Sequence, residues 1–136
     1  MYHLVYVSSA VNLFTDVELK ELLEVSRRNN STCGITGLLL YIDGNFIQML
    51  EGEKEVVLAT QHRITKDPRH RGLITLLQGE CASRTFDQWS MGFQKVESGE
   101  AETTPGYSDF LRQGVDESTK RSAALRLLEN FRAINR

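Results

Sequence analysis

Two apolar segments joined by Asp43-Gly44 constrain the fold of this 136-residue chain more than any other feature. Residues 34–42 read GITGLLLYI and residues 45–50 read NFIQML, so both are rich in side chains that favour strands. An Asp-Gly pair between two such runs is typical of a tight β-hairpin. We therefore expect two adjacent antiparallel strands near the middle of the sequence.

The segment before this hairpin predicts one strand followed by one helix. Residues 2–8 are rich in β-forming side chains. Thr15 lies three residues before Glu18, which is the capping-box pattern of a helix start. Asn29 and Asn30 favour turns over helix interiors, so we expect the helix to end there. The side chains expected on its inner side are Val17, Leu19, Leu22, Leu23 and Ser26.

The segment after the hairpin predicts a second helix and two more strands. Residues 53–66 have helical composition, and Pro68 cannot continue that helix. Residues 73–77 and 88–96 favour strands. The resulting order predicts an α+β, ferredoxin-like βαββαββ sheet with two helices on one face. The side chains expected on the inner side of the second helix are Val56, Val57, Thr60 and Ile64.

The chain divides into a domain over residues 1–96 and an extension over residues 97–136. The first half of the extension is rich in Gly, Ser, Thr and Glu and predicts a linker. Residues 118–135 regain a helical apolar stripe, and a lone helix of this length is marginal in water. We expect the stripe to pack on the helix-free face of the sheet or on another protomer.

Composition narrows the class of protein. A formal charge of −2 with both signs interspersed argues against nucleic-acid binding through a basic face. No apolar run approaches the roughly 18 residues that cross a membrane, and we see no signal peptide, so we expect a cytoplasmic location. Cys33 and Cys81 stand far apart, which favours two reduced thiols over a metal site. The sequence has no common hydrolase, metalloprotease or nucleotide-binding motif.

Polar side chains occur where a core is expected. By strand alternation, Tyr6 lies with Leu4 and Ser8 on one face, and Gln48 lies with Phe46 and Leu50 on one face. If both faces point to the helices, a phenol and an amide meet in the interior, where an unpaired group costs about 1–3 kcal/mol. The pair could simply bond each other or backbone, or it could form a polar edge that faces a ligand.

A second polar cluster lies at the predicted helix ends. Arg63 and Asp67 are four residues apart and would share a helix face, either as a surface ion pair or as ligand contacts. With the Asn pair of the first helix, they would surround a gap suited to a planar heterocycle that carries carbonyls and an imide N–H. Trp89 and Met91, two apart on the last predicted strand, could fill the core or form movable packing beside Gln48.

Taken together, these residues resemble the BLUF family, the blue-light sensors that bind FAD. The size and the C-terminal helical extension resemble the short, stand-alone BLUF proteins. The matching pieces, in the family's order and spacing, are Tyr6-Val7-Ser8; Asn29-Asn30 with residues 34–39; residues 46–52; Arg63 with residues 67–70; and residues 84–91.

The resemblance implies that FAD lies between the two helices with its ring edge toward the sheet. Asn30 would bond the carbonyl and imide edge of the ring, with Asn29 beside it. Arg63 and Asp67 would bond the opposite pyrimidine edge. The implied cofactor-binding residues are Tyr6, Asn29, Asn30, Gln48, Arg63, Asp67, Arg69 and His70, the last two near the ring or its ribityl–phosphate tail.

The resemblance also implies a photochemical role for Tyr6, Gln48, Trp89 and Met91. Light would drive electron and proton transfer from Tyr6, and Gln48 would rotate or change tautomer, so that a new hydrogen bond shifts the absorption to the red. Nothing covalent forms, and the change reverses in darkness. The signal would leave by way of Trp89 and Met91 toward the C-terminal helix.

The resemblance therefore implies a photosensory protein rather than an enzyme, with a homo-oligomeric dimer or ring and a downstream protein partner. Two alternatives stay open on the residues alone. One is a small ferredoxin-like hydrolase of the acylphosphatase type, although the sequence has no Arg-bearing, glycine-rich phosphate loop after the first strand. The other is a colourless ligand-binding regulatory domain.

Overall fold

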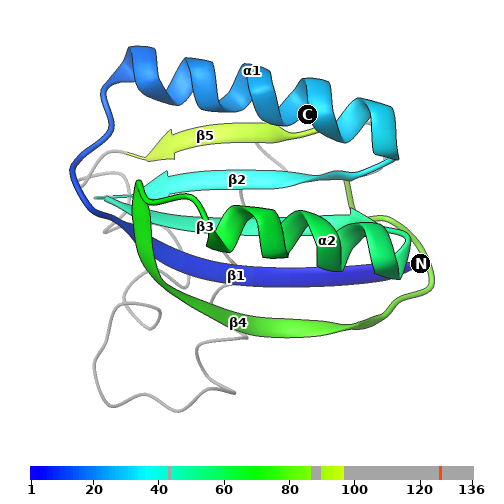
Figure 1. Ribbon diagram of the computed structural model, residues 1–136. Coiled ribbons are helices and arrows are strands. Elements are labelled where there is room, and N and C mark those ends of the chain that lie inside the picture. The colour runs from blue at the N-terminus through cyan, green and yellow to red at the C-terminus, as the bar shows by residue number, and fades with distance from the viewer. Residues whose placement is uncertain (43, 87–89, 97–125, 127–136) are drawn as a thin grey trace.

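The computed structural model describes residues 1–42, 44–86, 90–96 and 126, which form one mixed sheet and two helices (Figure 1). The strand order is β4-β1-β3-β2-β5, with β5 parallel to β2 and the other pairs antiparallel. The predicted ferredoxin-like order of elements is confirmed. The elements are β1 (Tyr2–Ala10), α1 (Asp16–Cys33), β2 (Thr36–Ile42), β3 (Asn45–Gly52), α2 (Lys54–Thr65), β4 (His70–Glu80) and β5 (Gly92–Val96).

Helix α1 begins where the sequence predicts and ends later. Thr15 and Glu18 form the predicted capping box. The predicted end at Asn29 and Asn30 is wrong, because the helix continues to Cys33. Gly34 then adopts a left-handed conformation with φ of 74°, and its N–H donates to the carbonyl of Asn30. Both asparagines therefore lie on the last turns of α1, held in a regular helix.

Other boundaries also differ from the sequence prediction. Strands β1, β3 and β4 are longer than their apolar runs, because main-chain pairing continues beyond these runs. Tyr2 lies opposite Gly52 of β3 and Glu80 of β4, and Ala10 lies opposite His70 of β4. The last strand begins at Gly92, so Met91 precedes β5 instead of lying within it. Val17 was expected inside but is 67% exposed on the first turn of α1.

Both helices lie on the same side of the sheet (Figure 1). Leu19 of α1 and Val57 of α2 join the core with sheet residues such as Leu4 and Leu50. On the opposite side, alternation places a second set of buried apolar side chains, which comprises Val5, Leu38, Leu40, Ile47 and Met49. The sheet thus buries apolar side chains on both faces, and α1 and α2 cover one of them.

The predicted linker and C-terminal helix lie outside the described residues, except for Arg126, which is helical. Asp43, at the hairpin turn, and Trp89 also lie outside them. Gly44, the second residue of the turn, has φ of 82°, as a glycine-dependent turn requires. Neither described helix is long and apolar enough to cross a membrane.

Candidate functional site

A cavity of about 240 Å³ lies between α1 and α2 above the middle of the sheet. Its lining is mainly apolar, with Leu22 on the α1 side, Ile64 on the α2 side and Leu39 on the floor. Polar side chains converge on it from several elements. The cavity is lined by all eight residues that the sequence analysis assigned to cofactor binding, which are Tyr6, Asn29, Asn30, Gln48, Arg63, Asp67, Arg69 and His70.

The floor of the cavity carries a buried chain of three side chains. Tyr6 and Gln48 lie directly opposite each other in the β1–β3 pairing, and the Tyr6 hydroxyl donates to Gln48 Oε1. Gln48 Nε2 in turn donates to Met91 Sδ at 3.4 Å. The three side chains are 3%, 4% and 1% exposed, respectively. The carboxamide is therefore oriented by a donor on one side and an acceptor on the other.

The electrostatic setting of Tyr6 keeps its phenol neutral. Burial raises the pKa of Tyr6 well above its ordinary value, and the negative charge of Asp67 adds to that shift. A neutral phenol can donate its hydrogen to Gln48, whereas a phenolate cannot. Tyr6 is therefore a neutral hydrogen-bond donor to Gln48.

The two asparagines of α1 differ in environment. Asn30 is buried, and its Nδ2 donates to the main-chain carbonyl of Ser90 at 3.0 Å. Because an amide nitrogen carries two hydrogens, Asn30 retains a second donor. Asn29 is exposed at the rim of the cavity. Helical geometry places these two neighbours on different sides of the helix, so Asn30 faces the interior and Asn29 the opening.

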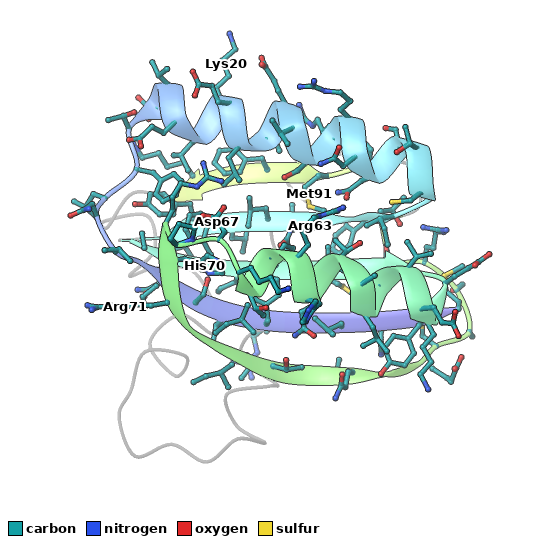
Figure 2. All side chains as sticks on the ribbon, in the orientation of Figure 1. Lys20, Arg63, Asp67, His70, Arg71 and Met91 are labelled. Carbon is teal, nitrogen blue, oxygen red and sulfur yellow. The ribbon has the colours of Figure 1, made fainter. Side chains whose placement is uncertain are left out.

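The charged residues after α2 are arranged differently from the sequence prediction. The helix ends at Thr65, so Asp67 does not share a helix face with Arg63, and the interpretation as an i, i+4 pair is wrong. Asp67 instead accepts from the main-chain N–H and the side-chain Nε of Arg69, both at 2.9 Å. Figure 2 shows Arg63 in the space between the helices and Asp67 with His70 at one end of that space. Among the described residues, Arg63 forms no ion pair.

This Asp67–Arg69 contact sets the charge at that end of the cavity. The hydrogen bond from the Arg69 side chain is the main cause that lowers the pKa of Asp67, and the same bond raises the pKa of Arg69. Both groups are partly exposed, so the pair contributes under about 1 kcal/mol to stability. It places a paired carboxylate and guanidinium at the lining of the cavity.

Two buried polar atoms at the cavity have no hydrogen-bond partner among the described residues, Ser8 Oγ and His70 Nδ1. The other ring nitrogen of His70 lies 2.6 Å from the carbonyl of Ile64. A buried unpaired polar atom costs about 1–3 kcal/mol, which a ligand carrying polar atoms would offset. The sequence analysis missed Ser8 as a site residue, although it shares the Tyr6 face of β1 by alternation.

An aromatic cluster closes the cavity at the start of α1. Phe14, Tyr41 and Phe46 contact one another, and the Phe14 main-chain N–H donates to the Tyr41 hydroxyl at 2.9 Å. The Arg69 guanidinium lies 5.7 Å from the centre of the Phe14 ring. Phe14 lies in the irregular loop between β1 and α1, where no periodic pattern predicts the position of a side chain.

These features fit a flat heterocycle such as a flavin ring. Apolar walls on two helices suit its faces, and the amides of Asn30 and Gln48 can both donate and accept at its edges. The two unpaired atoms at Ser8 and His70 provide further contacts for a polar ligand. Among the described residues, no cluster of three His, Cys, Asp or Glu could hold a metal ion.

Known proteins resemble this chain over most of its length. The sequence matches the family model BLUF, described as sensors of blue-light using FAD, over residues 1–92. Photoactivated adenylate cyclase subunit beta of Euglena longa is 31% identical over 111 residues, which cover 81% of this chain and 13% of that protein. The chain therefore spans about an eighth of the length of that relative.

Two further similarities are also to proteins connected with light. The blue light- and temperature-regulated antirepressor BluF of Escherichia coli (strain K12) is 32% identical over 74 residues, which cover 54% of this chain and 18% of BluF. The solved structure of the BlsA photo-activated state superposes with a TM-score of 0.75 at 28% identity and covers 93% of this chain and 94% of that one. The sheet and helices described above are thus similar in arrangement to those of BlsA.

Proposed function

Since the chain belongs to the BLUF family, the sensors of blue-light using FAD, we propose that the cavity between α1 and α2 holds the flavin ring and that Tyr6 and Gln48 convert light into a change of hydrogen bonding. The buried Tyr6–Gln48–Met91 chain supports this proposal most directly. The family match favours a photosensory protein over the acylphosphatase-type and colourless alternatives.

The polar residues around the cavity would hold the cofactor from several sides. Asn30, with its remaining amide hydrogen, would bond the carbonyl and imide edge, with Asn29 at the opening. Arg63 has no ion-pair partner among the described residues and is free to meet the pyrimidine edge together with Asp67. Arg69 and His70 would lie near the ring or its ribityl–phosphate tail.

FAD would supply absorption of blue light and a strongly oxidising excited state. Tyr6 then acts as the electron and proton donor, because its buried phenol is neutral and already hydrogen-bonded. Gln48 would relay this proton, and once the electron and a proton have returned to Tyr6 its neutral carboxamide would be left rotated or as the other tautomer, since a carboxamide both donates and accepts. Its bond to Met91 Sδ is weak and can break at little cost.

The light-induced change would leave the sheet through the part of the chain that follows it. We propose that a rearranged Gln48 repositions Met91 and Trp89, and that the change reaches the extension over residues 97–136. The apolar stripe of residues 118–135 would pack on the buried apolar face opposite α1 and α2. A homo-oligomer and a downstream protein partner in the cytoplasm would then respond to the change.

Purification of the full chain and identification of its bound flavin test the proposal. We expect FAD, separated from FMN by chromatography after release, and a dark spectrum with flavin bands. Blue light should shift these bands to the red, and darkness should restore them. A protein that stays colourless after reconstitution with FAD, or that binds FAD but shows no reversible shift, would contradict the proposal.

A further inference from the structure

The described residues between β4 and β5 contact opposite faces of the sheet. At the start of this connection, residues 84–86 contact the end of β3 through Glu51, whose side chain alternation places on the face opposite Gln48. At its end, Met91 contacts Gln48 on the face covered by the helices. Figure 2 shows Met91 between α1 and the sheet. Residues 84–86 therefore contact one face of the sheet, and Met91 contacts the other face at Gln48.

The Glu51 carboxylate fixes the start of the connection. Glu51 is fully buried, with Oε2 accepting from the main-chain N–H of Thr85 and Oε1 accepting from that of Phe86, both at 2.6 Å. The hydroxyl of Thr36, its cross-strand neighbour, also donates to Oε1 at 3.2 Å. Arg84 donates to that hydroxyl and to the Glu51 carbonyl. Three donors thus converge on one carboxylate.

Helix α1 fixes the end of the connection. Arg27 Nε donates to the Met91 carbonyl at 2.9 Å, and Asn30 Nδ2 donates to the Ser90 carbonyl. The Met91 side chain crosses β2 at Gly37, where an added Cβ would lie 3.3 Å from Met91 Cε. Hydrogen bonds thus hold the main chain on both sides of residues 87–89: Glu51 bonds residues 85 and 86, and α1 bonds residues 90 and 91, next to the contact of Met91 with Gln48.

We propose that Glu51 is a positioning residue for the light response, which sets the contact between Met91 and Gln48 by anchoring residues 84–86 from the far side of the sheet. A buried carboxylate is weak support for stability, since an apolar residue of the same size often serves as well. It does specify geometry, because each oxygen demands a donor in a fixed place. The inference rests on the proposed function for its light readout.

The substitution Glu51→Gln tests the role with little change of shape. The carboxamide keeps one acceptor oxygen but turns an NH₂ group toward a main-chain N–H, so one of the two anchoring bonds is lost. Glu53→Gln is the matched control, since Glu53 is exposed and makes no capping hydrogen bond. Met91→Leu removes the sulfur acceptor. All proteins are studied as full chains loaded with FAD.

Two measurements separate positioning from a purely structural role. The first is the rate of dark recovery after blue light. In the wild-type background we expect Glu51→Gln to accelerate recovery about threefold. In the Met91→Leu background we expect less than about 1.5-fold, because the effects of substitutions at residues that act through one another do not add. The second is methyl NMR of methionine in darkness, with Met91 identified by its loss in Met91→Leu. Its signal should move in Glu51→Gln and stay in place in Glu53→Gln.

Three results would overturn the inference: an unmoved Met91 signal, an unchanged recovery rate, or an equal acceleration in the Met91→Leu background. Absence of any light-induced shift in wild type would refute the proposed function instead, and the NMR measurement would still decide the role of Glu51. If Glu51→Gln does not fold, Thr36→Val takes its place, since it removes one donor to the carboxylate at nearly constant shape. The same displacement of Met91 is expected, and its absence contradicts the inference.

Discussion

A double-mutant cycle between Tyr6 and Gln48 gives the most informative prediction from the site. Tyr6→Phe leaves Gln48 Oε1 without its donor, and Gln48→Leu leaves the Tyr6 hydroxyl without its acceptor, in each case at 4% exposure or less. Removing one partner of a buried hydrogen bond costs about 1–3 kcal/mol, whereas replacing both partners by apolar groups is nearly neutral. The double variant should therefore lose less stability than the two single variants together, by at least about 2 kcal/mol.

Urea unfolding in darkness, followed by far-UV circular dichroism, measures the cycle. All four proteins need the same degree of saturation with FAD, because ligand binding raises apparent stability. The three variants should also bind FAD and lose the light-induced red shift. Stability losses that simply add would refute the claim that the phenol and the carboxamide are each other's partner. A normal red shift in either single variant would refute their photochemical roles.

Two further predictions concern cofactor binding and pH. Asn30→Ala should weaken FAD binding by about 1–3 kcal/mol, or roughly 5- to 150-fold in Kd, because it removes a buried amide. A fluorescence titration with FAD measures this change. An effect no larger than that of Asn29→Ala would contradict the prediction. Burial raises the pKa of Tyr6 in the folded protein above its value in the unfolded chain, which is near 10. The neutral phenol therefore contributes its full stability below about pH 10, and this contribution is lost as the pH rises further. Relative to Tyr6→Phe, wild type should lose up to about 1.4 kcal/mol per pH unit there, and urea midpoints with equal pH dependence in both proteins would count against the assignment.

The sequence predicted the order of elements because each carries a local signal. The hairpin turn at Gly44 and the capping box at Thr15 and Glu18 depend on neighbouring residues and appear where expected. The predicted end of α1 is wrong because turn propensity at Asn29 and Asn30 does not stop the helix. The helix ends just before Gly34, four residues beyond Asn30, because this glycine supplies the left-handed cap. Local propensity is a weak guide where a better terminator follows.

The site was partly predictable because alternation alone places Tyr6 and Gln48 on one face of adjacent strands. Other features depend on contacts between distant parts of the chain. The Asp67–Arg69 pair exists because α2 ends before Asp67, and the unpaired His70 Nδ1 depends on how that loop turns back. Glu51 lies just beyond the apolar run of residues 45–50, and two of its three donors are Thr85 and Phe86, which lie 34 and 35 positions later in the chain. Such long-range hydrogen bonds leave no periodic trace in a sequence.

NMR of the Gln48 side-chain amide would test the central claim most directly. Uniform ¹⁵N labelling shows each glutamine NH₂ group, and Gln48→Leu identifies the signals of Gln48 by their loss. In the FAD-loaded chain, blue light should move these signals as the bonds to Tyr6 and Met91 are exchanged, and darkness should restore them. Gln48 signals that stay in place while the flavin absorption shifts to the red would contradict the account.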